Sequence, residues 1–329
     1  KLIAERSSMA TTALKASIAK GIDLSLSSGT TTIGDISSTG LVRSAAYNSP
    51  IRKVIFEESI ALSPNQAQEK VAEVERALET AAADDLFRQG VSPHAPYTAS
   101  GQLYQGLAAL ARSRKIPLAT HTAETEAEIQ FLSTGTGEFR DFLLNMNALP
   151  GDWNPPRTSP VSYLHSLGVL KTHCLLIHCN YLDQASIELI AESGNSVVYC
   201  PRSHAFFGHG KHPVRRLLDA GIRVALGTDS LASNASLSIL DEMRFLAQKR
   251  TDLKTEEILK AATVNGANAL NLGDETGQLK PGSRADITVL EVPSGMKESK
   301  FVEQILEGSG ECIGTIIGGN IAWRRKDRT

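Results

Sequence analysis

The chain has 329 residues, with 34 basic and 36 acidic side chains, a formal net charge of −2 and 41% hydrophobic residues. This ordinary balance excludes a strongly basic nucleic-acid-binding protein and gives no sign of disorder. No apolar run approaches the roughly 18–20 residues that a membrane span requires, and the residues after Lys1 lack the apolar core expected of a signal peptide. The four cysteines form no CxxC pair. That pattern favours reduced thiols in a cytoplasmic protein over a disulfide framework. From the charge balance and the lack of a long apolar run, we expect no nucleic-acid or membrane partner.

Short apolar runs that end in polar residues alternate with longer amphipathic stretches along the chain. We expect strands at Thr30–Asp35, Arg52–Glu57, Gly90–His94, Pro117–His121, Cys174–His178, Ser196–Cys200 and Arg223–Asp229. We expect helices at Lys1–Lys20, Gln66–Ala83, Ser100–Ser113 and Tyr181–Ser193. This alternation predicts βαβ units around a parallel sheet, and so an α/β fold.

Chemically active side chains close four of the predicted strands, at His94, His121, His178 and Asp229. In a (β/α)8 barrel the carboxyl ends of all strands open on one face, where catalytic groups converge. A doubly wound sheet would instead concentrate such residues at one switch point. The spread along the chain therefore favours a TIM-type (β/α)8 barrel. Because only seven strands are predicted and a helix comes first, strand 1 is expected upstream of Lys1.

The chain changes character after Gly277, where GQLKPGSRADITVLEV and CIGTIIGGNIAW combine turn residues with β-forming runs. No helix is expected between these two runs. We therefore predict a barrel over residues 1–271. Residues 272–329 would form the C-terminal part of a small β-sandwich domain.

The segment THTAET places His121 three residues before Glu124. Histidine is the commonest metal ligand, and a nearby carboxylate can move protons to and from a metal-activated water. Taken alone, the pair also fits a hydrogen-bonded strand-end histidine followed by a helix N-terminal carboxylate. Asp229 alone likewise fits a helix cap or a turn residue. The functional interpretation depends on the whole set in chain order, which is His121 with Glu124, then His178, then Asp229, at the ends of three strands.

This ordered set resembles the amidohydrolase superfamily, in its branch of metal-dependent deaminases and chlorohydrolases acting on purine-, pterin- and triazine-like rings. The motifs that carry the resemblance span nearly the whole chain and are GTTTIGDI, VSPHAPYT, THTAET, LIHCNYLD, CPRSH, ALGTDSLASN and GQLKPGSRADITVLEV. Within that branch the chain resembles the aminofutalosine, S-adenosylhomocysteine and guanine deaminases. The function implied is deamination of a nucleoside- or purine-like ring. The alternative is chlorohydrolase or aminohydrolase chemistry on triazine-like rings.

The resemblance also implies roles for individual residues. His121 and Asp229 would bind one divalent metal ion, zinc or alternatively iron, and Asp229 would accept a proton from the attacking water. Glu124 would carry protons to the ring nitrogen and the leaving group. His178 would lie at the metal and orient the water or the tetrahedral centre, and His94 would contact the substrate.

The loop CPRSHAFFGHGKH supplies further candidate contacts for a flat heterocycle, namely Arg202, Ser203, His204 and Phe207. The alternative is that the phenylalanine packs the loop and the histidines face solvent. The stretch Glu138–Leu170 is a candidate lid over the site. Within it, Trp153 would either stack on the substrate or anchor the loop.

The sequence departs from the family pattern in one feature. The family has a His-x-His pair at the end of strand 1, and no such pair occurs in this sequence. We expect that pair on a segment upstream of Lys1, and we expect residues 1–329 alone to bind metal weakly and to lack activity. A metal-free relative acting as a binding or scaffold protein is the alternative. The sequence does not decide which heterocycle is the substrate, which metal is bound, or whether the protein is a homodimer.

Overall fold

The structure, a computed structural model, is built around a seven-stranded parallel sheet in the order β1-β2-β3-β4-β5-β6-β7. The residues that it describes are 9–37, 40–46, 48–80, 84–295 and 297–326. The strands are β1 (Thr32–Ser37), β2 (Arg52–Ser59), β3 (Phe87–Pro93), β4 (Leu118–Thr122), β5 (Cys174–His178), β6 (Ser196–Tyr199) and β7 (Arg223–Leu226). All seven predicted strands are confirmed; both ends of Cys174–His178 are as predicted, and the other strands differ by up to three residues at one or both ends.

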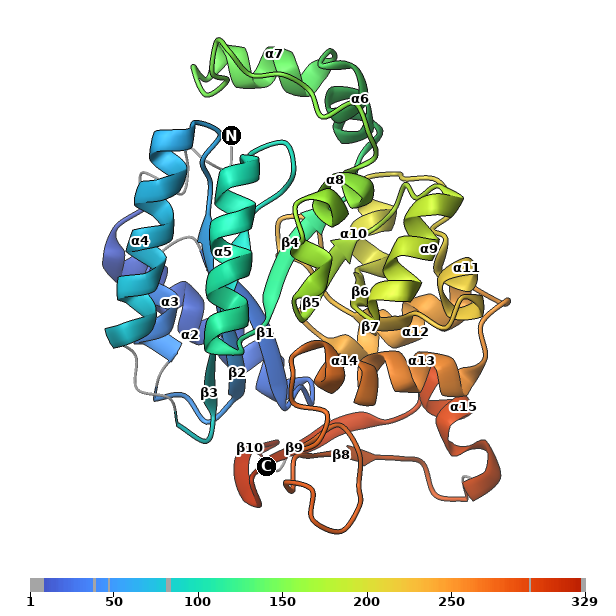
Figure 1. Cartoon of the computed structure of the whole chain (residues 1–329). Helices are drawn as coiled ribbons and strands as arrows, with labels where there is room; N and C mark the ends of the chain where they lie inside the picture. Colours follow the sequence, from blue (N-terminus) through green and yellow to red (C-terminus); the bar gives the residue numbers. More distant parts are fainter. Residues whose placement is uncertain (1–8, 38–39, 47, 81–83, 296, 327–329) are drawn as a thin grey trace.

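Helices precede, separate and follow the strands, and several of them cover the outer side of the curled sheet (Figure 1). They are α2 (Thr11–Ser27), α3 (Leu41–Ala46), α4 (Pro64–Thr80), α5 (Gly101–Arg114), α6 (Glu126–Thr134), α7 (Glu138–Asn145), α8 (Pro160–Ser166), α9 (Gln184–Ser193), α10 (Pro201–Phe206), α11 (Val214–Asp219), α12 (Ile239–Lys249), α13 (Thr255–Ala262) and α14 (Val264–Ala269), with the short 3-10 helix η1 (Val169–Lys171). The predicted helices at 66–83, 100–113 and 181–193 correspond to α4, α5 and α9, although residues 81–83 lie outside the described part. This arrangement is a partial (β/α) barrel. The strand expected upstream of Lys1 stays a prediction.

The first predicted helix, Lys1–Lys20, is observed as α2, which lies further along the chain. Residues 1–8 are outside the described part, and the helix continues past Gly21. It continues because Ile22 and Leu26, four residues apart, are buried on the same apolar face. This apolar spacing outweighs the low helix propensity of the glycine.

Strand side chains alternate between an inner core inside the curl and an outer core against the helices. On β4, Leu118 packs in the outer core and Ala119 packs in the inner core. Phe56 of β2 fills the inner core beside Gly90, where a Cβ atom would lie only 2.4 Å from the Phe56 ring. The alternation fixes the side of the sheet on which each strand-end residue emerges.

The C-terminal segment forms a three-stranded antiparallel sheet in the order β10-β9-β8, drawn at the bottom of Figure 1. Its strands are β8 (Ile287–Glu291), β9 (Glu311–Ile317) and β10 (Asn320–Arg324). The prediction that no helix interrupts this segment is wrong, because η2 (Glu298–Lys300) and α15 (Phe301–Leu306) lie between β8 and β9. Six residues are too few to reveal a helical period in the sequence. Burial of Ile305 and Leu306, which end α15, stabilises it.

Hydrogen bonds attach this small sheet to the start of the barrel segment. Thr315 Oγ1 donates to the Leu26 carbonyl at 2.6 Å, and Thr288 Oγ1 donates to the Gly29 carbonyl at 2.5 Å. Among the described residues after 271, the strands form one sheet. The division between residues 1–271 and 272–329, and the β-sandwich that the sheet would complete, stay predictions. No described helix is both long and apolar enough to cross a membrane, and the cytoplasmic location stays a prediction.

Candidate active site

His121 and His178 come from adjacent strands and meet inside the carboxyl end of the curled sheet. His121 follows Ala119 by two residues on β4, so it faces the inner side. His178 ends β5 with a φ of 72°, which turns its imidazole from the outward direction that alternation would give. His121 Nδ1 and His178 Nε2 are 3.2 Å apart, and the two rings stack. The structure therefore brings these two predicted site residues together.

Burial keeps these imidazoles uncharged at neutral pH. Desolvation lowers the pKa of His121 to about 3, and a charge on His178 acts in the same direction. Desolvation likewise lowers the pKa of His178 to about 4 and that of His94 to about 3. A neutral imidazole offers a nitrogen lone pair, which is the form that binds metal ions.

Glu124 lies in the turn that follows β4, with its Oε1 atom 3.6 Å from His178 Nε2. Burial, followed by repulsion from Asp229, raises the pKa of Glu124 to about 7. A carboxyl group that titrates near neutral pH can both accept and donate a proton within one catalytic cycle. Its position beside the histidines suits the proton-carrying role expected from the sequence.

Asp229 follows β7 with a φ of 56°, in the left-handed region of backbone conformation. Its Oδ2 atom accepts hydrogen bonds from Ser203 Oγ and Ser233 Oγ, both at 2.7 Å, and its Oδ1 atom accepts one from the Ser230 N–H at 2.7 Å. Burial acts to raise the pKa of Asp229, but the hydrogen bonds from Ser203 and Ser233 outweigh it, so the pKa is lowered. Asp229 is therefore held as a carboxylate.

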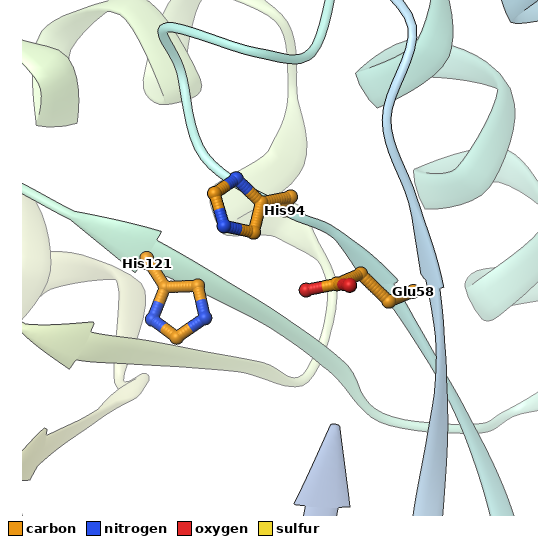
Figure 2. Close-up of side chains that lie close together, drawn as sticks. All are labelled: Glu58, His94 and His121. Carbon is orange, nitrogen blue, oxygen red and sulfur yellow. The ribbon is translucent and has the colours of Figure 1, made fainter. Parts of the chain in front are cut away.

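Glu58, near the end of β2, is a site residue that the sequence pattern did not predict. Figure 2 shows its carboxylate pointing toward His94 and His121. One ligand atom from each of these three residues lies within 4.8 Å of the other two. His94 is held in place by a 2.6 Å hydrogen bond between its Nδ1 atom and Thr98 Oγ1. The strand-end criterion would have found Glu58 if the predicted strand had extended one residue past Glu57.

Two predicted substrate contacts of the loop after β6 form bonds within the protein. Ser203 is buried, and its hydroxyl donates to Asp229 rather than pointing into open space. Arg202 places its Nη1 atom 3.8 Å from Asp241 Oδ2, while its backbone N–H donates to Glu242. The loop therefore supports Asp229 directly.

Two other predicted contacts of this loop, His204 and Phe207, lie in different surroundings. The ring of His204 is 5.4 Å from that of His209, and burial, with charges on His209 and His178, lowers the pKa of His204 to about 4. Phe207 is 55% exposed and packs edge-on against Phe206. His204 is thus within electrostatic reach of the histidine pair, whereas Phe207 largely faces solvent.

Trp153 stacks on Phe131, with ring centroids 4.3 Å apart and planes 8° from parallel. Both belong to an apolar cluster that includes Leu143 of α7. The helices α6 and α7 project together at the top of Figure 1. This contact favours the anchoring alternative for Trp153 over stacking on a substrate. The candidate lid at 138–170 contains α7 and α8, joined by a loop.

The donor atoms at this end of the sheet suit a metal ion. Two groups of described residues each bring three such atoms within 4.8 Å of one another. The first group is Glu58, His94 and His121, and the second is His121, Glu124 and His178. Neutral imidazole and carboxylate donors are those that zinc and iron(II) take in proteins. Asp229, which the sequence predicted as a ligand, belongs to neither group, and its carboxylate oxygens accept three protein hydrogen bonds.

The sequence of the chain matches a family model over almost its whole length, since residues 5–322 fit the Amidohydrolase family. The chain belongs to the amidohydrolase family. The resemblance seen in the strand-end motifs is therefore confirmed, and the histidines and acidic residues described above lie at the carboxyl ends of strands in an amidohydrolase fold.

Relatives of this amidohydrolase include a deaminase with a known substrate class. The 5-methylthioadenosine/S-adenosylhomocysteine deaminase of Syntrophobacter fumaroxidans is 34% identical over 215 residues, which cover 63% of this chain and 44% of the relative. The chain thus spans less than half the length of that relative.

Solved structures share the fold. The aminofutalosine deaminase of Helicobacter pylori, in complex with methylthio-coformycin, matches with a TM-score of 0.82 and 24% identity, covering 92% of this chain and 74% of that one. An adenosine deaminase from Xanthomonas campestris with bound zinc matches with a TM-score of 0.78 and 24% identity, covering 98% of this chain and 73% of that one. These matches confirm the predicted α/β fold of the amidohydrolases.

Proposed function

We propose that the full-length protein is a metal-dependent hydrolase that deaminates an amino-substituted heterocycle, with a nucleoside-like compound as substrate. The observation that carries the proposal is one arrangement of side chains. Glu124 Oε1 lies 3.6 Å from His178 Nε2, which lies 3.2 Å from His121 Nδ1. Neutral imidazoles beside a carboxyl group that titrates near pH 7 suit hydrolysis by an activated water. The similarity to the S. fumaroxidans deaminase supports the substrate class.

We propose that one divalent ion binds at this site, with His121, Asp229 and His178 as its contacts from this chain. Zinc suits this set of nitrogen and oxygen donors, and iron(II) is the alternative. When bound, the ion supplies Lewis acidity, which makes a water molecule acidic enough to attack near neutral pH. The zinc in the X. campestris deaminase structure supports the choice of metal.

The residues around the ion manage protons and orientation. Asp229, kept ionised by its hydrogen bonds, accepts a proton from the attacking water. Glu124 carries a proton to the ring nitrogen and then to the leaving amine. His178 orients the water or the tetrahedral carbon, since its imidazole lies close to both the Glu124 carboxyl group and the His121 imidazole. His94 contacts the heterocyclic ring.

From the loop after β6, the substrate contacts proposed are Arg202, His204 and Phe207. The hydroxyl of Ser203 and the ring of Trp153 are taken up by contacts within the protein, so we do not include these two residues.

The proposal is tested by incubating the full-length, zinc-loaded protein with S-adenosylhomocysteine, 5′-methylthioadenosine, adenosine, guanine and a chlorotriazine. Ammonia and chloride release are measured for each compound. The expected result is ammonia from at least one nucleoside and no chloride from the triazine. Turnover of the triazine alone would favour the chlorohydrolase alternative, and binding without turnover of any compound would favour the scaffold alternative. Sedimentation of the same sample tests whether the protein is a homodimer.

A further inference from the structure

The turn that presents Glu124 is held by a second glutamate that never reaches the site. Glu128 lies on the first turn of α6 and is completely buried. Its Oε1 atom accepts a hydrogen bond from the Ala123 N–H at 3.0 Å, and its Oε2 atom accepts one from the Glu124 N–H at 2.8 Å. Both oxygens of one carboxylate thus bind consecutive amides of the turn.

The backbone of this turn needs such support. Ala123 has a φ of 51°, in the left-handed region that a residue with a Cβ atom adopts only at a cost. On the other side of the turn, Asn180 Nδ2 donates to the Glu124 carbonyl at 3.0 Å. The N–H and the C=O of Glu124 are therefore each held by a buried side chain from a different element, so its side chain starts from a fixed backbone.

A purely structural role would not favour a carboxylate at position 128. Burial acts to raise the pKa of Glu128, whereas the N–H groups of Glu124 and Ala123, one on each oxygen, act to lower it because they stabilise the ionised form. An apolar side chain could fill the same volume under α6 without burying an ionisable group. What the carboxylate adds is a pair of acceptors spaced to bind two adjacent N–H groups.

We infer that Glu128 is a positioning residue, which fixes the backbone of the turn so that the Glu124 carboxyl group meets His178 and the substrate in the correct place. This inference rests on the proposed function, in which Glu124 carries protons. Glu128 has no exposed surface, so it cannot touch the substrate itself.

The first test is Glu128→Gln in the full-length, zinc-loaded enzyme. Glutamine keeps the volume but has one acceptor, and its NH2 group would face the second backbone N–H. We expect kcat to fall by roughly 10- to 100-fold, because displacements of about an ångström at a reacting group cost rates of that order. KM should stay within about twofold and the zinc content should not change.

The control is Thr125→Ala, which removes the N-cap of the same helix. Thr125 Oγ1 accepts from the Glu128 N–H at 3.1 Å but makes no bond to the two amides held by the carboxylate. It should lower the melting temperature of the enzyme about as much as Glu128→Gln does, while kcat stays within about threefold. An equal loss of kcat in both variants would reduce Glu128 to a helix-stabilising residue and overturn the inference.

The deciding test combines Glu128→Gln with Glu124→Gln. If Glu128 acts through Glu124, the double variant loses no more kcat than Glu124→Gln alone, since groups that act as a unit are not additive. Losses that multiply would overturn the inference and leave the proposed function standing. Normal turnover of Glu124→Gln itself would overturn the proposed role of Glu124. If Glu128→Gln fails to fold, Asn180→Ala removes the other hold on the turn, and its loss of kcat should also vanish in the Glu124→Gln background.

Discussion

The two ends of the parallel sheet bury acidic side chains in opposite ways. At the amino-terminal end, Arg52 of β2 donates from Nε to Asp286 Oδ2 at 2.6 Å and from Nη2 to Asp286 Oδ1 at 3.0 Å. Both of these side chains are almost completely buried. At the carboxyl end, Glu124 faces the neutral imidazole of His178 and is repelled by Asp229.

The consequence appears in the pKa values. Burial acts to raise the pKa of Asp286, but hydrogen bonds from Arg52 and the Gly318 N–H outweigh it, so the pKa is lowered. Burial and a neighbouring carboxylate together raise the pKa of Glu124 to about 7. Burial beside a guanidinium group therefore gives a charged pair that joins the C-terminal sheet to the barrel. Burial beside a neutral imidazole and a second carboxylate gives a carboxyl group whose pKa lies near neutral pH.

The largest effect on the carboxyl end is expected from Asp229→Asn. The amide is a poorer ligand for a divalent ion and cannot accept a proton from water, so kcat should fall by about 10²- to 10⁴-fold with loss of zinc affinity. Activity and metal content of the full-length enzyme measure this. The control is Ser233→Ala, which removes one hydrogen bond to Asp229 and should cost about tenfold or less. If Asp229→Asn kept both zinc and kcat, Asp229 would be only a turn residue.

The opposite end should respond in stability and not in activity. Arg52→Met leaves Asp286 buried without its partner, and breaking a buried ion pair in this way costs about 3–5 kcal/mol. Urea denaturation measures the loss, while kcat of the folded enzyme should change little. Adding Asp286→Asn should recover much of the stability, because the uncompensated charge is then gone. No loss of stability in Arg52→Met would show that the pair does not join the sheet to the barrel.

A smaller effect is expected on the stability of the folded protein. An ionised Glu124 should lower the free energy of unfolding, whereas an ionised Asp286 should raise it. The pKa of Glu124 rises from 4.5 unfolded to about 7 folded. Between these values the folded state binds more protons, so its stability falls as pH rises from about 4.5 to 7. In metal-free protein, Glu124→Gln should therefore be more stable than the parent at pH 8, by about 2–3 kcal/mol, and should gain little at pH 4. If Glu124→Gln and the parent protein had the same urea midpoint at pH 8 as well as at pH 4, this prediction would be wrong.

Much of the fold could be predicted because strands buried on both sides read as continuous apolar runs. Cys174–His178 is such a run, and its strand was found with both ends correct. The helix α15 is not predicted from the sequence, because its six residues form a stable helix only in contact with the rest of the molecule. Such short elements depend on tertiary packing rather than on local pattern.

The candidate site could be predicted only in part, because residue type and strand position do not give side-chain direction. His121 and His178 are together, yet the contact of His178 depends on a positive φ that the sequence does not reveal. Ser203 was expected at the substrate, but α10 turns its hydroxyl to Asp229. The sequence does not point to Glu58, because the predicted strand ends at Glu57 and the observed strand continues to Ser59.

The proposed function depends most on Glu124 as the group that carries protons at a metal site formed at the carboxyl ends of the strands. The most direct test is kcat and zinc content of Glu124→Gln in the full-length enzyme, measured on the best nucleoside substrate. Loss of a proton carrier typically costs about 10²- to 10⁴-fold, so we expect kcat to fall at least about a hundredfold. Zinc should be retained, because the imidazoles and Asp229 are unchanged. Turnover near that of the parent enzyme, with zinc retained, would contradict the account.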